Sequence, residues 1–177
     1  RENPIDLLIA NAGIGHGTGK YLMERPEQTH ELSMINVIGV SNTVMPIINR
    51  MAARGRGQIA LMASIAGFAA VMQSPSYAAT KAYVKHWGEA LHGRLKPFGV
   101  EVTTICPGYV KSAMTDANRF KMPFLMETDR AVDIMVRGME AGKARVAFPW
   151  QITWPVGLAS VLPSFIATRL NSLKRKP

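Results

Sequence analysis

A tyrosine and a lysine four residues apart are the most informative feature of the sequence. Tyr77 and Lys81 belong to the run Ser-Tyr-Ala-Ala-Thr-Lys-Ala-Tyr, which is typical of a helix. Residues i and i+4 lie on one face of a helix, so the phenol and the ammonium group are predicted to be neighbours. A positive charge nearby favours the phenolate and lowers the tyrosine pKa from its usual value of about 10. A tyrosine tuned in this way exchanges a proton with a substrate oxygen.

Ser64 is a second candidate, because it ends an apolar run that is typical of a buried strand. Its hydroxyl is suited to donate a hydrogen bond to the same substrate oxygen. The pattern Y-x-x-x-K is short and common, however. Taken alone, it is better explained by a half-buried helix aromatic at Tyr77 and a solvated surface lysine at Lys81. Other motifs in the sequence are needed to decide between a catalytic pair and this structural interpretation.

Composition indicates one globular domain. The chain has 177 residues, of which 47% are hydrophobic and 19% charged, enough for a real core. The net charge of +9 favours an anionic partner, such as a phosphorylated cofactor or an anionic membrane surface, although a solubility charge explains it equally well. Aromatic residues are sparse and not interleaved with basic ones, so we expect no nucleic-acid binding. The single cysteine, Cys106, favours a reducing, cytoplasmic location and a role as a buried small hydrophobe. We expect no metal site.

Apolar runs alternate with helical patterns along the chain. Strands are predicted at residues 5–10, 58–64, 100–106 and 145–148, and helices at 27–54, 76–96 and 127–141. This alternation predicts an α/β fold: a three-layer α/β/α, Rossmann-like, doubly wound parallel sheet with helices on both faces. Ligands bind at the carboxyl ends of the strands in such sheets. Because Asn11, Ser64 and Pro107-Gly108 each follow a strand, we expect three loops to form one site.

Taken together, these residues make the sequence similar to the classical short-chain dehydrogenase/reductase family. The resemblance covers nearly the whole chain. Asn11-Ala12-Gly13 resembles the family's motif at a strand end, although Ala10 stands where a second asparagine is usual. Asn36 matches the family's helix asparagine, Ser64 its serine, and Tyr77 with Lys81 its Y-x-x-x-K pair. The run Pro107-Gly108-Tyr109-Val110-Lys111-Ser112 matches P-G-x-V-x-T with serine in place of threonine. Each motif is weak alone, and their agreement in order and spacing is strong.

The resemblance implies catalytic roles. Tyr77 would be the general acid that protonates a carbonyl oxygen, or the base in the reverse direction. Lys81 would lower the pKa of Tyr77, and Ser64 would bind and polarise the substrate carbonyl. Asn36 would hold a water that links Lys81 to solvent. A second interpretation, that the Asn36 amide mends a helix irregularity, is compatible with the first.

The resemblance also implies cofactor contacts and a subunit interface. Tyr77 and Lys81 would bind the nicotinamide ribose, Pro107, Gly108, Val110 and Ser112 the nicotinamide end, and Asn11, Ala12 and Gly13 the adenine-side ribose. NADP(H) is slightly preferred on the basic charge balance alone, with NAD(H) as the alternative. The helices that carry Asn36 and Tyr77 would pack against a second copy, in a homodimer or homotetramer.

The sequence departs from the family at its start. The family opens with a glycine-rich strand–turn–helix that binds the pyrophosphate, and its second strand selects NAD or NADP. Neither is present, so roughly 70–80 residues of a mononucleotide-binding half are missing. We therefore expect residues 1–177 to be a single partial domain, the catalytic half, within a longer protein. Alone, this half would expose an apolar sheet edge, be poorly stable and be inactive.

Residues 150–177 are predicted to form an apolar and basic tail. No charged residue lies between Val146 and Thr168, and two tryptophans stand near the start of this stretch. Its length suggests a membrane span, but Pro149, Pro155 and Pro163 argue against one. A lid over the site or a subunit contact is favoured. A segment that lies on anionic lipid is the third interpretation.

The leading hypothesis is an NAD(P)-dependent oxidoreductase that interconverts a carbonyl and an alcohol. Residues 113–126 are rich in methionine and phenylalanine, which predicts a lipophilic small-molecule substrate, unless this loop has no role in specificity. A non-catalytic dinucleotide sensor or scaffold is the alternative from another class, and a peripheral membrane protein is a third. An intact Ser64–Tyr77–Lys81 set argues against the sensor, which has no use for a general acid.

Overall fold

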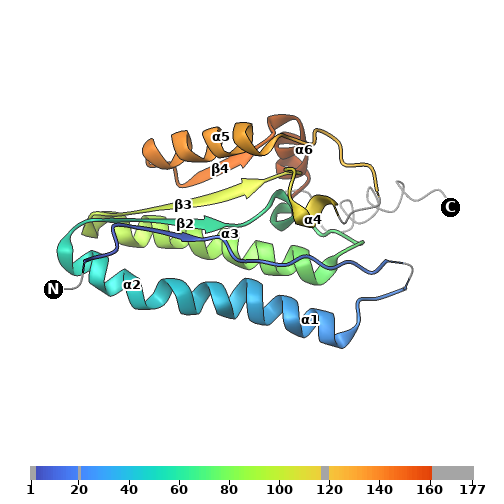
Figure 1. Ribbon diagram of the computed structural model, residues 1–177, viewed down its shortest axis with the longest axis horizontal. Coiled ribbons are helices and arrows are strands. Elements are labelled where there is room, and N and C mark those ends of the chain that lie inside the picture. The colour runs from blue at the N-terminus through green and yellow to red at the C-terminus, as the bar shows by residue number, and fades with distance from the viewer. Residues whose placement is uncertain (1–2, 20, 117–119, 161–177) are drawn as a thin grey trace.

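The computed structural model describes residues 3–19, 21–116 and 120–160, and it confirms the α/β fold (Figure 1). Four parallel strands form one sheet in the order β1-β2-β3-β4. They are β1 (Leu7–Ala10), β2 (Gly57–Met62), β3 (Val100–Pro107) and β4 (Arg145–Phe148). All four predicted strands are therefore present, with ends that differ by a few residues at most. Since the strands are parallel, their carboxyl ends lie at the same edge of the sheet.

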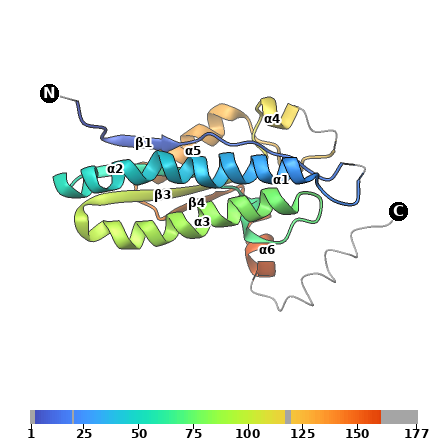
Figure 2. The ribbon, with the colours of Figure 1, turned by 90° about the horizontal axis from the view of Figure 1, so that it is seen from below.

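Helices cover both faces of the sheet. On one face lie α1 (Pro26–Ser33), the π-helix η1 (Met34–Gly39), α2 (Val40–Arg54) and α3 (Pro75–Leu95), and on the other lies α5 (Thr128–Glu140) (Figures 1 and 2). Shorter helices fill the connections: η2 (Ile65–Phe68), η3 (Lys96–Phe98) and α4 (Ala113–Asp116). The last described helix, α6 (Trp150–Ser160), follows β4 directly.

The core has two parts because alternate strand residues point to opposite faces. On the α2 and α3 side, Ile59 and Leu61 of β2 are buried against Val44 and Val84. Ala60, between them in sequence, belongs to the cluster under α5. The sheet is thus buried on both faces along β2 and β3, as the continuous apolar runs of these strands predict.

The predicted helix over residues 27–54 is interrupted by a π turn. The chain runs as α1, then η1, then α2, and Asn36 is buried within η1. A π turn accommodates one extra residue and is frequent at functional sites. The whole stretch Pro26–Arg54 is also long and apolar enough to cross a membrane by length and composition. In this structure its inner side chains, among them Leu32 and Val44, are buried in the fold.

β1 is the edge strand and carries an exposed apolar face. Among the described residues it pairs with β2 alone. Ile5, Leu7 and Ile9 are 46%, 46% and 50% exposed, while Leu8, which points to the other side, packs on the core. This is the exposed apolar surface that the sequence predicts at the first strand.

The predicted tail begins as a helix. Residues 150–160 form α6 with Pro155 inside it, a helix of 11 residues that starts the apolar tail expected from the sequence. The remainder of the tail, residues 161–177, lies outside the described residues.

Helix α3 approaches β3 so closely at Gly88 that no side chain fits. A Cβ atom there would lie 2.2 Å from Thr104 Oγ1 and 2.8 Å from a Leu61 methyl group. We therefore predict that Gly88→Ala lowers the free energy of unfolding by about 1–3 kcal/mol. Gly93 lies in the same helix with nothing near its Cβ position, so Gly93→Ala is expected to stabilise the protein by up to about 1 kcal/mol.

Denaturant melts of the two variants test this packing. Equal effects at both glycines would contradict the close approach of α3 to the sheet.

Candidate active site

The three predicted loops meet at the carboxyl edge of the sheet. The loop after β1 carries Gly13, the loop after β2 carries Ser64, and Gly108 follows β3. Tyr77 lies in the first turn of α3. Gly67 allows η2 to pack directly on α3, because a Cβ atom there would lie 2.6 Å from the Lys81 carbonyl. This close approach brings Ser64 to the helix that carries Tyr77.

Lys81 is buried beside Tyr77. Its side chain is 4% exposed, and its Nζ lies 5.8 Å from the centroid of the Tyr77 ring. The ammonium group donates a hydrogen bond of 2.9 Å to the carbonyl oxygen of Met62, at the end of β2. On another side it faces Gly13, where a Cβ atom would lie 3.2 Å from Nζ. The phenol and the ammonium are neighbours, and the interpretation of Lys81 as a solvated surface lysine is wrong.

Burial controls the protonation of this pair. Removal from water lowers the pKa of Lys81 to about 8, so the side chain is mostly charged at neutral pH. The pKa of Tyr77 is raised, chiefly because burial disfavours the phenolate. A hydrogen bond with Ser64 opposes that rise, and the neighbouring Tyr109 adds to it. Tyr77 therefore keeps its proton at neutral pH.

The net change in the Tyr77 pKa is a rise, opposite in direction to the lowering expected from a neighbouring Lys81. The physical reason is that desolvation of the phenol is the largest influence on its pKa. The ammonium group is, in addition, directed at the Met62 carbonyl, which accepts its hydrogen bond.

Ser64 is fixed by backbone groups on both sides. It is 9% exposed, and its Oγ accepts a hydrogen bond of 3.1 Å from the N–H of Ala66, at the start of η2. The hydroxyl also lies 3.4 Å from the carbonyl oxygen of Pro107 and forms a hydrogen bond with Tyr77. The two hydroxyl groups are therefore adjacent, as the sequence predicts, and both can reach one substrate oxygen.

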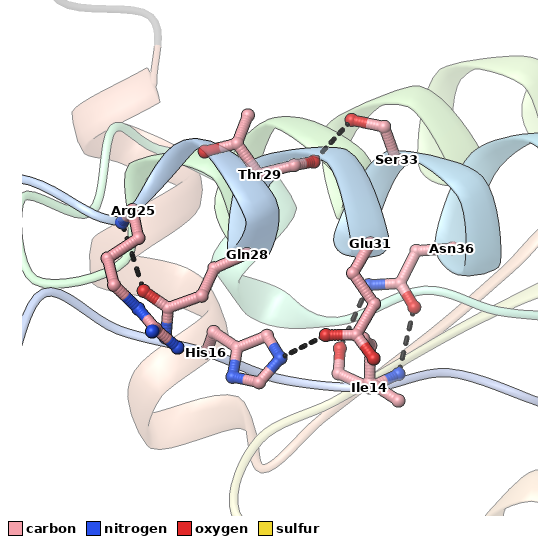
Figure 3. A network of polar contacts seen from close by, with 8 residues as sticks. All are labelled: Ile14, His16, Arg25, Gln28, Thr29, Glu31, Ser33 and Asn36. Carbon is pink, nitrogen blue, oxygen red and sulfur yellow. Dashed lines mark hydrogen bonds and ion pairs between the residues drawn. The ribbon is translucent and has the colours of Figure 1, made fainter.

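Asn36 connects three parts of the site (Figure 3). Its Nδ2 donates to the carbonyl oxygen of Ile14 at 2.9 Å and to Thr80 Oγ1 at 3.1 Å. Its Oδ1 accepts a hydrogen bond of 2.9 Å from the Ile14 N–H. Thr80 in turn donates to the Tyr77 carbonyl oxygen at 2.8 Å.

These hydrogen bonds distinguish between an amide that repairs its own helix and one that connects other elements. The π turn confirms the expected helix irregularity, but the amide bonds leave its own helix and join the first loop to α3. The water relay through Asn36 stays a prediction.

The loop after β1 is fastened at further points that sequence reasoning missed. His16 Nε2 lies 3.0 Å from Glu31 Oε2 in α1 (Figure 3), and the Thr18 N–H donates to the Gln73 carbonyl oxygen at 2.9 Å. Glu24 is buried, and its Oε2 accepts a hydrogen bond of 3.0 Å from the Ser76 N–H. A carboxylate from this loop thus caps the helix that carries Tyr77, where negative charge suits the helix dipole.

The loop after β3 is shaped by Gly108 and Thr115. The Gly108 N–H donates to the Phe148 carbonyl oxygen at 2.7 Å, and a Cβ atom at Gly108 would lie 2.9 Å from Pro149 Cδ. Thr115 is buried, and its Oγ1 accepts a hydrogen bond of 2.8 Å from the Ser112 N–H and lies 2.9 Å from the Val110 carbonyl oxygen. Sequence reasoning missed Thr115, although a hydroxyl residue beside a short helix is a known signal for such a turn.

The predicted cofactor residues lie on both sides of Tyr77. Asn11 and Ala12 are exposed after β1, with Gly13 half-buried beside Lys81. On the other side, Pro107, Gly108 and Val110 are half-buried and Ser112 is exposed. The structure therefore brings both predicted sets to one edge of the sheet.

Apolar side chains lie close to the phenol. A Cβ atom at Gly15 would lie 3.3 Å from Met114 Sδ and 3.8 Å from the Tyr77 ring. The ring of Tyr109 meets that of Phe120 edge to face, with centroids 6.0 Å apart. Met114 and Phe120 belong to the predicted substrate segment, residues 113–126, of which 117–119 lie outside the described residues.

Cys106 does not take part in this chemistry. It is fully buried in β3, and burial raises the pKa of its thiol to about 12. A thiol of this kind is unreactive, which confirms its interpretation as a small hydrophobe. Among the described residues, no group of three or more His, Cys, Asp or Glu side chains is placed to hold a metal ion.

The buried charge of Lys81 gives a prediction about stability. Lowering a lysine pKa from 10.5 to about 8 corresponds to a destabilisation of the charged form on the order of 3 kcal/mol. That cost is present below pH 8 and disappears as the pH rises towards 10.5, because the unfolded state then holds more protons than the folded one. We predict that Lys81→Met is at least as stable as the wild type at neutral pH, and that its advantage shrinks above pH 8.

Denaturant melts across this pH range measure the difference, and Lys96→Met, at an exposed lysine, is the control. A Lys81→Met variant that is clearly less stable at neutral pH would contradict the cost of the buried ammonium.

Comparison with known proteins agrees with this geometry. Residues 1–122 match the family model described as short chain dehydrogenase. An uncharacterized oxidoreductase of Myxococcus xanthus is 41% identical over 160 residues, which is 90% of this chain and 63% of the relative. One of Mycobacterium tuberculosis is 31% identical over 172 residues, 93% of this chain and 65% of the relative. The chain thus spans somewhat less than two thirds of the length of these curated relatives.

Solved structures share the fold. A short-chain dehydrogenase from Sphingobium yanoikuyae in complex with NADPH superposes with a TM-score of 0.78 at 22% identity, covering 100% of this chain and 68% of that one. A bulky-bulky ketone specific alcohol dehydrogenase from Comamonas testosteroni gives 0.74 at 22% identity, covering 98% and 64%. On the family model, the curated relatives and the site geometry together, the chain belongs to the short-chain dehydrogenase family.

Proposed function

We propose that this chain is the catalytic part of an NAD(P)-dependent oxidoreductase that interconverts a carbonyl and an alcohol. The observation that carries the proposal is the pair of hydroxyl groups on Ser64 and Tyr77, joined by a hydrogen bond beside the buried Lys81. Family membership and relatives named as oxidoreductases support the reaction class.

The protein's part in the reaction is proton transfer and orientation. Tyr77 is protonated at neutral pH, which is the state that a general acid requires. Ser64 donates a hydrogen bond to the carbonyl oxygen and polarises the bond, and Tyr77 gives that oxygen its proton. The charge of Lys81 stabilises the phenolate that remains. A nicotinamide cofactor, when bound, supplies the hydride.

The residues at the site fit the nicotinamide end of such a cofactor. The exposed Asn11 and Ala12 and the open Ser112 flank Tyr77 on either side, and a side chain at Gly13 would fill the space in front of Lys81. In the Sphingobium yanoikuyae structure the cofactor is NADPH, which supports a nicotinamide dinucleotide here. The preference for NADP(H) over NAD(H) rests on the net charge of +9.

A lipophilic carbonyl compound is the proposed substrate. Met114 and the Tyr77 ring both lie close to Gly15, and Phe120 packs on Tyr109. Adaptable methionine and aromatic side chains suit an apolar ligand. Curated relatives include a very-long-chain 3-oxoacyl-CoA reductase from Ajellomyces capsulatus, 30% identical over 87% of this chain. Its name agrees with a substrate that carries a long apolar chain.

Tyr77→Phe, made in the longer protein of which this chain is expected to be the catalytic half, tests the reaction. Loss of the hydroxyl removes the general acid, so turnover of NADPH with a panel of carbonyl compounds is expected to fall by about 100- to 10,000-fold. Binding of NADPH, followed by its fluorescence, is expected to survive. Tyr83→Phe, six residues along the same helix and exposed, is the matched control and should keep its activity.

The same assay separates the enzyme from a dinucleotide sensor. If the full-length wild type binds NADPH but turns over no member of the panel, the sensor is favoured and the proposed reaction is wrong.

We further propose that the outer side of the Asn36 helix is a contact between subunits of a homodimer or homotetramer. Met34, Ile38 and Met45 lie on one side of this helix and are 47%, 44% and 57% exposed. Large apolar side chains gathered on one helix face are typical of a protein interface.

Charges at this face should separate the subunits. We predict that Ile38→Glu combined with Met45→Glu lowers the mass measured by light scattering to that of a monomer. Val132→Glu, at a residue of α5 that is 47% exposed, is the control and should leave the mass unchanged. A double variant that keeps the mass of the wild-type oligomer would place the interface elsewhere.

A further inference from the structure

Helix α6 carries an exposed apolar stripe. Trp150, Trp154 and Leu158 are spaced four residues apart, so they lie on one side of the helix. Their exposed fractions are 68%, 77% and 68%. Single exposed apolar residues are ordinary, but two tryptophans and a leucine in a row on one helix are a candidate interaction surface.

The other side of α6 holds the helix in place. It contacts η2 and β4, and Thr153 Oγ1 donates a hydrogen bond of 3.0 Å to the Pro149 carbonyl oxygen. Figure 2 shows α6 on the side of the molecule away from α1 and α2. The apolar stripe is therefore presented outward from a fixed base, and it lies away from the helix face proposed as the subunit contact.

An apolar hollow adjoins the stripe. It has a volume of about 370 Å³ and is lined by Phe68, Arg145, Thr153, Trp154, Gly157 and Leu158. Arg145 is the one charged residue in its wall. Arg145 and Lys85 share a single carboxylate, Glu89, at 2.6 Å and 3.9 Å. This cluster therefore has a net positive charge beside the hollow.

The sequence around α6 also contains basic residues and no acidic ones. From Ala141 to the last residue there is no aspartate or glutamate. The basic residues in this range are Lys143, Arg145, Arg169, Lys174, Arg175 and Lys176, of which the last four lie outside the described residues. An apolar stripe beside the positive charge of Arg145 and Lys85 is complementary to a surface that is apolar beneath and anionic on top.

We propose that α6 binds to the surface of an anionic lipid bilayer. Trp150, Trp154 and Leu158 enter the boundary between head groups and acyl chains, where tryptophan rings are most favourable. Lys143 and Arg145, the two described basic residues of this stretch, are expected to meet the anionic head groups and to add to the attraction. The association is peripheral, and it does not depend on the proposed reaction.

A second copy of this chain fits the stripe less well. Pairing two such surfaces would bring two basic clusters together with no acidic residue from this part of the chain to match them, and like charges across an interface are unfavourable.

Vesicle co-sedimentation tests the proposal. The purified protein is mixed with vesicles of phosphatidylcholine alone or of phosphatidylcholine with phosphatidylserine. We expect binding to the anionic vesicles, weak binding to the neutral ones, and loss of binding in high salt. Trp150→Gln combined with Trp154→Gln should reduce binding by about tenfold or more. Phe98→Gln, at an aromatic residue that is 48% exposed in η3, is the control and should bind as the wild type does.

Two checks keep the test decisive. The double variant should keep the far-ultraviolet circular dichroism of the wild type, because both tryptophans are exposed. In the wild type, lipids brominated on their acyl chains should quench tryptophan fluorescence, which shows that the rings enter the bilayer. Equal binding to both kinds of vesicle, or unchanged binding by the double variant, would overturn the proposal. The proposal would also be overturned if the wild type bound no vesicles and the double variant changed the oligomeric mass. The stripe would then be a subunit contact.

Discussion

The burial of one positive charge, the ammonium group of Lys81, is the constraint on which the site depends. A lysine that is 4% exposed is costly unless its charge finds a partner. Here the Met62 carbonyl oxygen at the end of β2 accepts its hydrogen bond at 2.9 Å. That contact requires α3 to lie close to the sheet, and glycines at 67 and 88 make the approach possible, since a Cβ atom at either would overlap its neighbours. The position of Tyr77 follows, because it lies one turn before Lys81 on the same helix.

A single cause, removal from water, moves the pKa values of Lys81 and Tyr77 in opposite directions. It lowers that of Lys81 to about 8 and raises that of Tyr77. At neutral pH the result is a mostly charged lysine beside a neutral phenol, which is a proton donor with a stabilising charge next to it. Asn36 and Glu24 hold this arrangement in place through hydrogen bonds to groups other than the phenol. Asn36 joins the first loop to Thr80 of α3, and Glu24 caps the start of that helix through the Ser76 N–H.

Much of this could be predicted from the sequence, because order along the chain determines neighbours in a parallel sheet. Three strands with Asn11, Ser64 and Pro107 at their ends must bring those residues to one edge. The hydrogen bonds of Asn36 to Ile14 and Thr80 could not be predicted, since they depend on the Ile14 backbone lying opposite the helix. Glu24 was missed because its role comes from one hydrogen bond between distant parts of the chain. Thr115 was missed because its hydroxyl acts only within its own turn, on Ser112 and Val110. The direction of the Tyr77 pKa was predicted wrongly because spacing reveals a neighbouring charge but not the depth of burial.

The most direct test of the account is a measurement of the Lys81 pKa itself. Nuclear magnetic resonance of protein with isotope-labelled lysine side chains follows each ammonium group through a pH titration, and the Lys81→Arg variant identifies the signal by its loss. We predict that this signal titrates near pH 8, well below the ordinary lysine value of 10.5. A Lys81 signal that titrates at the ordinary value would contradict the buried ammonium group and the positioning of Tyr77 that rests on it.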